Sequence, residues 1–345
     1  MKAVLLKAGS GGGAPTAQVS EVPVPRLRGG ELLVAMKACG LCGTDIEKMH
    51  GEYTAAMPVL GHEAVGVVTQ VEGTVNGIKK GDRVFPHHHV PCGECYYCRK
   101  GNQTMCDHYK TSNLDPGGFS EFIRVPTWNV SHGGVLKLPD GLDFEEASLI
   151  EPLACCMRAI DRCGVEPGDT VLVAGAGPVG MTHALLLASM KAKVIVSDIS
   201  KDRLEFATHA NVGAVVDAGK VDVPREVRQR SQNRGADLAI VASGSLRAIE
   251  QSLKSVRKGG KVCIFGVPPK GSVLQYDVSD PYNSEVSIFS SYAATDADTA
   301  KAAKLLASRK VDLGSLITHR FPIAEFGRAV ETMAAGKSMK VVITP

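Results

Sequence analysis

Four cysteines in one short segment have the spacing of a metal site. The sequence reads Cys92-x2-Cys95-x2-Cys98-x7-Cys106. Four thiolates complete the tetrahedral coordination that zinc takes in structural sites, so no position remains for a substrate. An iron–sulfur cluster is also compatible with four thiolates, but nothing else in the chain indicates electron transfer. We therefore predict a structural zinc in a lobe of about residues 91–107.

A second set of possible metal ligands lies nearer the N-terminus. Cys42 is part of the sequence CGLCGTD, and His62 and Glu63 are part of GHEAVG. Thiolate, imidazole and carboxylate groups all bind zinc. Taken alone, these residues are modest evidence, because a single cysteine or histidine is more often a core residue than a ligand.

A glycine-rich turn in the middle of the chain is typical of a dinucleotide site. Gly175-Ala-Gly-Pro-Val-Gly180 follows an apolar run and precedes an expected helix. Gly175 allows the tight turn, Gly177 lets the backbone approach a pyrophosphate, and Gly180 lets helix and strand pack closely. The helix N-terminus offers free N–H groups to the phosphates. We therefore predict that the cofactor contacts Gly175, Gly177, Pro178, Val179 and Gly180.

An aspartate after the next expected strand indicates which dinucleotide binds. Asp198 follows the apolar run that begins at Lys193. Its carboxylate can accept hydrogen bonds from both hydroxyl groups of an adenosine ribose and would repel a 2′-phosphate. The sequence therefore favours NAD over NADP.

The elements that position these residues fall into zones. The first, up to about residue 150, has short β-type runs punctuated by glycine and proline, at 32–38, 64–71, 83–85 and 120–125. The second alternates apolar strands, at 171–174, 193–197, 214–217, 237–242, 261–267 and 286–291, with helices at 179–190, 201–210 and 246–256. This alternation predicts a parallel sheet with right-handed crossovers. The last zone has amphipathic helices at about 297–308 and 322–335 and a strand at 340–344.

Charge and composition narrow the function classes. Lysine and arginine total 39 against 36 acidic residues, a net charge of +3. This balance does not favour nucleic acid or a membrane surface as partner. We find neither a signal peptide nor an apolar run of about 20 residues, so a cytoplasmic protein is expected. The run His87-His88-His89 is more simply explained as a turn than as a metal site.

Together these motifs identify a resemblance over essentially the whole chain. The sequence resembles zinc-dependent medium-chain dehydrogenases/reductases, most closely the polyol branch of sorbitol and L-iditol 2-dehydrogenase-like enzymes. The motifs occur in family order: CGLCGTD, GHEAVG, the four-cysteine lobe, GGFSEF, EPLACC, GAGPVG and ITHRFPIAEFGRAVETMAAGKSMKVVITP. The resemblance implies an α/β protein with a mostly-β, GroES-like catalytic domain at 1–152 and 292–345. A doubly wound Rossmann domain for NAD would occupy 153–291.

The resemblance also implies roles for individual residues. Cys42, His62 and Glu151 would bind a catalytic zinc, with Glu63 binding the metal directly or holding its water. Thr44 matches the hydroxyl group that receives the substrate proton. Two zinc ions per chain and a homotetramer are expected.

Three further positions match cofactor contacts of the family. Arg203 matches a basic residue beside the adenosine ribose, and Lys340 matches one near the pyrophosphate. Val267 lies in a segment that lines the nicotinamide.

Two departures from the family pattern concern the substrate. Relatives usually have a proton-relaying histidine where this chain has Glu47, and sorbitol dehydrogenases often have arginine where it has Ser291. A glutamate is a poor base near neutral pH unless burial raises its pKa. Our hypothesis is that Glu47 binds a substrate hydroxyl instead.

The expected activity is NAD-dependent oxidation of a secondary hydroxyl of a polyol or sugar. One alternative is a threonine-type amino-alcohol dehydrogenase or a simple alcohol dehydrogenase. A non-enzymatic alternative is a zinc-stabilised Rossmann binding protein. The sequence does not distinguish which polyol is used or whether it is phosphorylated.

Overall fold

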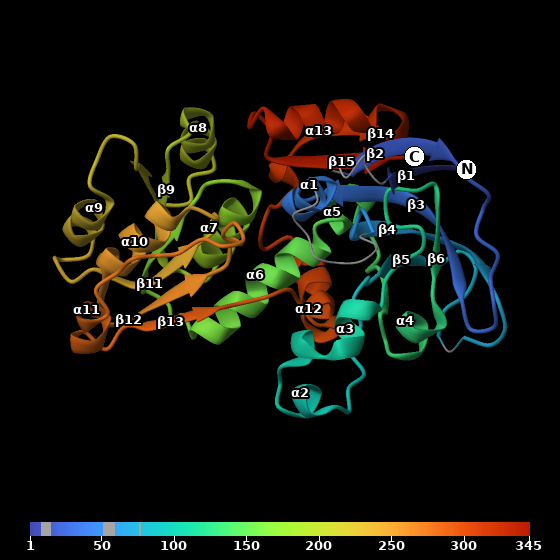
Figure 1. Ribbon diagram of the computed structural model, residues 1–345, viewed down its shortest axis with the longest axis horizontal. Helices are drawn as coiled ribbons and strands as arrows, with labels where there is room; N and C mark the ends of the chain where they lie inside the picture. The colour runs from blue at the N-terminus through green and yellow to red at the C-terminus, as the bar shows by residue number, and fades with distance from the viewer. Residues whose placement is uncertain (8–14, 51–58, 76) are drawn as a thin grey trace. The chain divides into compact units, whose positions relative to one another are not determined.

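The computed structural model describes residues 1–7, 15–50, 59–75 and 77–345 (Figure 1). The chain divides into two compact units, Met1–Ala154 with Ala294–Pro345, and Cys155–Ala293. The boundaries expected from the sequence are 152/153 and 291/292. One unit therefore combines both ends of the chain, and the other is a continuous stretch.

The continuous unit contains a parallel six-stranded sheet. Its order is β10-β9-β8-β11-β12-β13. Counted from β8, this is the 3-2-1-4-5-6 order of a dinucleotide-binding Rossmann fold. The strands are β8 (Thr170–Ala174), β9 (Lys193–Asp198), β10 (Ala214–Asp217), β11 (Ala236–Val241), β12 (Val256–Ile264) and β13 (Ser287–Ser290). All five residues of β8 are buried, as expected for an apolar strand inside a parallel sheet.

Helices connect these strands. They are α7 (Pro178–Ser189), α8 (Lys201–His209), α9 (Val223–Arg230), α10 (Leu246–Ser255) and α11 (Ser279–Asn283). Helix α9 was not expected from the sequence, because only Val223, Pro224 and Val227 of this polar segment are buried. Its start is nevertheless marked locally, since the Asp222 side chain accepts a hydrogen bond from the Arg225 N–H group.

The other unit contains a mostly antiparallel sheet of order β14-β15-β3-β4-β5-β7, with β6 also paired to β3. Its strands are β3 (Leu32–Leu41), β4 (Glu63–Val71), β5 (Arg83–Pro86), β6 (Phe122–Val125), β7 (Val135–Lys137), β14 (Ile317–Pro322) and β15 (Lys340–Thr344). A separate hairpin pairs β1 (Lys2–Lys7) with β2 (Thr16–Glu21). In Figure 1 the red C-terminal strand β15 lies beside the blue β3, although their sequences are far apart.

The same unit also contains helices. They are α1 (Gly43–Met49), α2 (Tyr96–Arg99), α3 (Asp107–Thr111), α4 (Thr127–Ser131), α5 (Phe144–Ala147), α12 (Asp296–Ala307) and α13 (Phe326–Ala334). A further helix, α6 (Ile150–Cys163), contains the boundary between the units. Residues from both chain ends, among them Val34, Ile123, Phe326 and Ile343, share one core. The C-terminal segment is thus part of the N-terminal fold.

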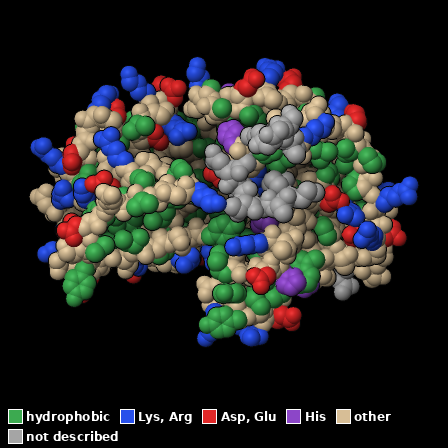
Figure 2. Space-filling view, viewed as in Figure 1, with side chains coloured by type: hydrophobic (Ala, Val, Ile, Leu, Met, Phe, Trp, Pro, Cys, Tyr) green, Lys and Arg blue, Asp and Glu red, His purple; other side chains and the backbone are tan. Residues whose placement is uncertain are grey.

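Two features of this architecture bear on partners. Within the described ranges, no helix is long and apolar enough to cross a membrane. On the face drawn in Figure 2, acidic and basic side chains are interspersed over both units. The described residues of that face do not form the clustered basic surface typical of nucleic-acid-binding proteins.

Candidate metal centres and cofactor site

Three predicted ligands converge in the mostly-β unit. One ligand atom each of Cys42, His62 and Glu63 lies within 4.8 Å of the others. Cys42 is the residue before α1, and Glu63 begins β4, directly after His62. The pairing of Gly40 with Glu63 brings the end of β3 and the start of β4 together. The sheet register therefore produces the cluster.

Asp45 holds two of these residues in place. Its Oδ1 lies 3.4 Å from His62 Nδ1 and accepts a hydrogen bond of 3.0 Å from the Gly61 N–H group. Its Oδ2 accepts a hydrogen bond of 3.1 Å from the Cys42 N–H group. Burial is the largest single influence and opposes ionisation of Asp45, but the charges of His62 and Lys48 and the hydrogen bonds from His62 and Gly61 together outweigh it and lower the pKa of the carboxyl group. An anionic Asp45 is thus suited to orient the His62 ring.

The charges around His62 favour a cation at this point. Burial tends to lower the pKa of the imidazole, but the charges of Asp45 and Cys42 raise it well above its usual value. Negative charges that stabilise the additional proton on His62 also stabilise a metal ion. The metal ion and this proton compete for the same imidazole nitrogen.

Glu63 also forms an ion pair with Lys340, and both side chains are buried. Glu63 is on β4 and Lys340 on β15, the two strands that flank β3. They meet over Gly40, where a Cβ atom would overlap Glu63 Oε2 and lie 2.7 Å from Lys340 Cε. The absence of a side chain at residue 40 thus makes room for this pair. Gly40 was not among the expected site residues, because its role depends on strands that are distant in the sequence.

Glu151 is close to this group without being one of the three clustered residues. It lies in the first turn of α6 and is 8% exposed. Burial is the largest influence on both neighbours: it raises the pKa of Glu63 and opposes the rise of the pKa of Lys340. The charge of Glu151 contributes to raising both pKa values. Thr44 is half-buried in the first turn of α1, and Glu47 follows one turn later. The ligand role predicted for Glu151 stays a prediction.

The four lobe cysteines form the second group, with one Sγ atom each within 4.8 Å of the others. Three of the sulfur–sulfur distances are 3.5, 3.6 and 3.9 Å. A zinc–sulfur distance of about 2.3 Å in a tetrahedron requires about 3.8 Å between sulfurs. Hydrogen bonds from the backbone of Glu94 and Cys95 lower the pKa of Cys92 to about 7, which favours the thiolate.

Both groups fit zinc by their donor chemistry. The lobe offers four sulfurs at tetrahedral spacing, which is the composition of a closed structural site. The other group offers one thiolate, one imidazole and one carboxylate, which leaves a position for a substrate. Glu63 Oε2 is paired with Lys340, whereas Oε1 is buried without a hydrogen-bond partner among the described residues, which leaves this oxygen for a metal ion.

The predicted cofactor residues gather at one edge of the parallel sheet. Gly175 follows β8, Asp198 ends β9, and Val267 lies shortly after β12, so all are at carboxyl ends of strands. The sheet order runs in opposite directions on the two sides of β8, which is where such folds bind dinucleotides. Gly175 has a φ of +112°, and a Cβ atom on Gly180 would overlap the Gly175 carbonyl oxygen.

The Asp198 carboxylate is already fixed by backbone groups. Its Oδ2 accepts from the Ala176 N–H group at 2.7 Å, and its Oδ1 accepts from Ile199 and Ser200 at 2.7 and 2.8 Å. Arg203 Nη1 lies 3.8 Å from Oδ2. An anion and a cation therefore lie side by side beside the glycine-rich turn.

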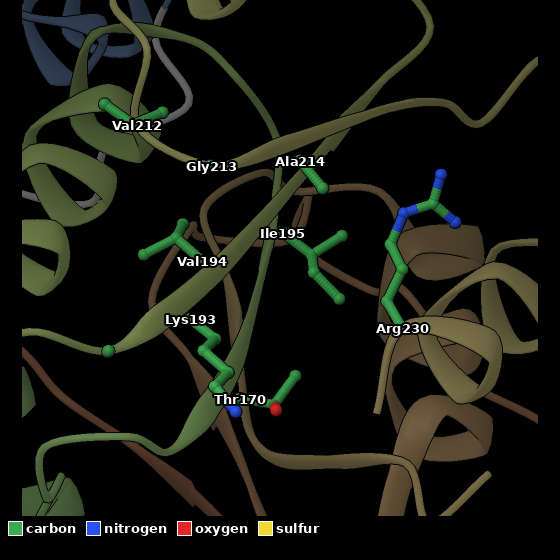
Figure 3. Close-up of a pocket in the computed structure, with 9 residues that line it drawn as sticks. Thr170, Lys193, Val194, Ile195, Val212, Gly213, Ala214 and Arg230 are labelled. Carbon is green, nitrogen blue, oxygen red and sulfur yellow. The ribbon is translucent and has the colours of Figure 1, made fainter. Parts of the chain in front are cut away.

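A hollow of about 360 Å³ lies at the opposite edge of this sheet (Figure 3). It is lined by residues that begin strands, among them Thr170, Lys193 and Ala214, together with Arg230 at the end of α9. It is therefore separate from the predicted cofactor residues.

The run His87–His89 is part of neither metal group within the described residues. The three histidines follow β5, and His87 and His88 are 1% and 7% exposed. Burial lowers the pKa of His89 to about 3 and that of His88 well below its usual value. The side chains of His88 and His89 are thus neutral and packed inside the protein.

Two protein-family models match this chain. Residues 28–140 match the family described as alcohol dehydrogenase GroES-like domain, and residues 178–308 match the family described as zinc-binding dehydrogenase. The chain is 32% identical over 332 residues to a sorbitol dehydrogenase of Halalkalibacterium halodurans, which covers 95% of both chains. It is 29% identical over 333 residues to an L-threonine 3-dehydrogenase of Yersinia pestis, covering 94% of this chain and 95% of the relative.

Solved structures share the whole fold. A protein of Sinorhizobium meliloti 1021, described as a zinc-binding dehydrogenase and bound to NADP, superposes with a TM-score of 0.88 at 29% identity, covering 100% of this chain and 99% of its own. An alcohol dehydrogenase of Escherichia coli CFT073 in complex with NADH has a TM-score of 0.88 at 25% identity, with the same coverage. This chain belongs to the zinc-dependent medium-chain dehydrogenase/reductase family, and it is an oxidoreductase with a GroES-like and a Rossmann-type domain.

Proposed function

We propose that this enzyme transfers a hydride from a secondary hydroxyl of a polyol or sugar to NAD. The observation that supports this most is the Cys42–His62–Glu63 group, which has the donor set of a zinc site with a free position. The sorbitol dehydrogenase among the relatives favours a polyol substrate. In this proposal the chain binds a second zinc through the four lobe cysteines.

The roles of the chain's own residues follow from their placement. Zinc bound at this group supplies Lewis acidity, which lowers the pKa of a contacting hydroxyl. Asp45 orients His62, and Lys340 keeps the Glu63 carboxylate within the group. Thr44, two residues after Cys42, accepts the proton of the substrate hydroxyl and gives its own proton to the cofactor ribose or to bound water, because a threonine hydroxyl cannot keep the extra proton. In this proposal the third zinc ligand is either Glu151 or Glu63.

We propose NAD as the preferred cofactor because of Asp198. Its carboxylate is held on the sheet edge by three backbone N–H groups, so it cannot easily turn away from a 2′-phosphate. Arg203 is the group that would favour NADP instead, since its guanidinium lies beside the same carboxylate.

A panel of alcohols with purified enzyme tests the function. NADH formation would be followed with hexitols and pentitols, L-threonine and butan-2-ol, each with NAD and with NADP, together with zinc analysis. We expect polyols to give the highest kcat/KM. The L-threonine 3-dehydrogenase relative makes L-threonine the main competing substrate. Absence of turnover with every alcohol, despite bound zinc and NADH, would favour the non-enzymatic alternative.

We further propose that the enzyme is a cytoplasmic homotetramer. Its thiolate zinc sites favour a reducing compartment. Unusually exposed apolar side chains occur between β12 and β13 and on the edge strand β13, at Val273, Val278, Tyr282 and Ile288. Such a surface is typical of an interface between protein chains. Light scattering of the purified protein measures the state directly.

A further inference from the structure

A second carboxylate lies beside Asp198 at the cofactor edge of the parallel sheet. Asp217 is the last residue of β10, and the strand register pairs it with Asp198, the last residue of β9. The chain stays close beyond this pair, because the Ala218 N–H group donates a hydrogen bond of 2.9 Å to the Asp198 carbonyl oxygen. Neighbouring strands lie about 4.8 Å apart. Asp217 is therefore a near neighbour of the residue that we assign to the adenosine ribose.

The Asp217 carboxylate is held in the short turn that follows β10. Its Oδ1 accepts a hydrogen bond of 3.0 Å from the Gly219 N–H group, and its Oδ2 lies 2.8 Å from Lys220 Nζ. A Cβ atom on Gly219 would lie 3.2 Å from Asp217 Oδ1 and 4.0 Å from Ile199 Cγ2. Ile199 directly follows Asp198 in the chain. The turn that contains the Asp217–Lys220 pair thus lies beside the turn that contains the Asp198 carboxylate.

Three basic side chains belong to the same part of the edge. Arg203 lies 3.8 Å from Asp198, Lys220 pairs with Asp217, and Lys201 begins α8 shortly after β9. The hydrogen bond from Lys220 is the largest influence on Asp217 and lowers the pKa of its carboxyl group, with a further contribution from the charge of Lys201. Asp217 is therefore anionic at neutral pH and balances the charge of Lys220.

We propose that Asp217 is a specificity-determining residue that disfavours NADP because it holds and neutralises Lys220. This inference rests on the proposed preference for NAD and adds a second determinant to Asp198. A phosphate monoester such as the 2′-phosphate of NADP carries a charge of about −1.5 to −2 at pH 7. The Lys220 side chain is 69% exposed, so loss of Asp217 would release it to attract this phosphate together with Lys201 and Arg203.

Two measurements separate this role from a structural one. NADH and NADPH share the pyrophosphate and the nicotinamide, so the ratio of their dissociation constants isolates the effect of the 2′-phosphate. Salt screens charges at a surface, with a Debye length of about 30 Å at 0.01 M and about 3 Å at 1 M ionic strength. An effect of charge should therefore fade at high salt, whereas damage to the turn would weaken both cofactors at either salt concentration.

The test is a fluorescence titration of the zinc-loaded enzyme with NADPH and with NADH, at about 0.01 M and about 1 M salt. Asp217→Asn removes the charge and keeps an oxygen for the Gly219 N–H group. A double variant adds Lys220→Ala and so removes the released cation. Asp169→Asn is the matched control, because Asp169 also accepts a backbone hydrogen bond, of 2.9 Å from Glu166, but lies directly before β8, at the opposite edge of the sheet.

We expect Asp217→Asn to tighten NADPH binding about 5-fold relative to NADH at low salt, which corresponds to about 1 kcal/mol. The change should fall below about 2-fold at high salt. The double variant should return to nearly the wild-type ratio, because the cation that attracts the phosphate is gone. Asp169→Asn should leave the ratio unchanged.

Three results would overturn the inference and leave the proposed NAD preference intact. They are an equal loss of affinity for both cofactors, an unchanged ratio, and a gain that persists in the double variant or at high salt. If Asp217→Asn does not fold, Lys220→Glu tests the same position and should weaken NADPH relative to NADH; an unchanged ratio there also overturns the inference. A wild-type enzyme that binds NADPH more tightly than NADH would overturn the NAD preference itself. The polyol proposal is tested separately, because no alcohol takes part in these titrations.

Discussion

Lys340 and Glu63 form a buried ion pair across strand β3, in the space above Gly40. One partner is near the C-terminus of the chain and the other begins β4 next to His62. The C-terminal strand thus reaches the candidate catalytic group and balances one of its negative charges. From the sequence, Lys340 is expected beside the cofactor pyrophosphate. Its ion pair with Glu63 suggests a second role, which is to hold the Glu63 carboxylate.

Gly40→Ala should disturb the Lys340–Glu63 ion pair, although it adds only one methyl group. The added methyl group would overlap Glu63 Oε2 and Lys340 Cε, and both side chains are buried. We expect a loss of about 1–3 kcal/mol in the free energy of unfolding and at least a 10-fold loss of kcat. Gly29→Ala is the matched control, because nothing lies within 4 Å of a Cβ atom there. Wild-type behaviour of Gly40→Ala would mean that the pair is not required.

The two glutamates near the metal group should respond differently to substitution. Glu151→Ala should abolish activity and weaken zinc retention, with NADH binding largely kept, if Glu151 is the third ligand. Glu63→Ala should then keep more zinc but reduce turnover. Glu63, not Glu151, is within the three-residue group of this structure. If zinc is lost only in Glu63→Ala, the roles of the two residues are exchanged.

Cys98→Ser should remove the lobe zinc and leave the other one. Metal analysis should fall from two zinc ions per chain to one, with the unfolding temperature lowered by roughly 5 °C or more. The single tryptophan, Trp128, reports on the lobe because it stacks on His108 of α3 at 4.1 Å. Its emission should change, while Cys156→Ser should keep both metals. One zinc per chain in the wild type would contradict this prediction.

Asp198→Ala should narrow the preference for NAD. Removal of the carboxylate eliminates the repulsion of a 2′-phosphate and leaves Arg203 to attract it. We expect the ratio of kcat/KM for NAD over NADP to fall about 10-fold or more. Asp202→Ala, which removes an exposed carboxylate of α8, should leave the ratio unchanged. A wild-type enzyme with the higher kcat/KM for NADP would refute the cofactor proposal.

Thr44→Val and Glu47→Gln should separate proton transfer from substrate binding. Thr44→Val removes a hydroxyl with little change of volume, so kcat should fall about 100-fold or more. Glu47→Gln should raise KM for the polyol more than it lowers kcat, because in our hypothesis this side chain binds a hydroxyl. A loss of kcat alone in Glu47→Gln, with the acidic limb of the pH profile removed, would identify Glu47 as the relay base.

Much of this protein is determined by local sequence. The glycine-rich turn, its flanking strand and helix, and the cysteine spacing each lie within one short segment, so residue order alone predicts them. The parallel sheet follows from the strand–helix alternation, and the comparisons confirm the α/β class and the family. Element ends were less predictable: β12 begins at Val256 and ends at Ile264, whereas 261–267 was expected.

The tertiary structure decided what depends on contacts between distant segments. Sequence alone gives no reason to join Gly40 with Glu63 and Lys340, because their relationship requires β15 to pair with β3. The histidine run reads locally as a turn, and only the packing of Tyr109 and Asp296 around it shows that His88 is held against His62. A short motif acts through its own backbone, whereas a site built from several strands depends on sheet register and burial, which neighbouring residues alone do not encode.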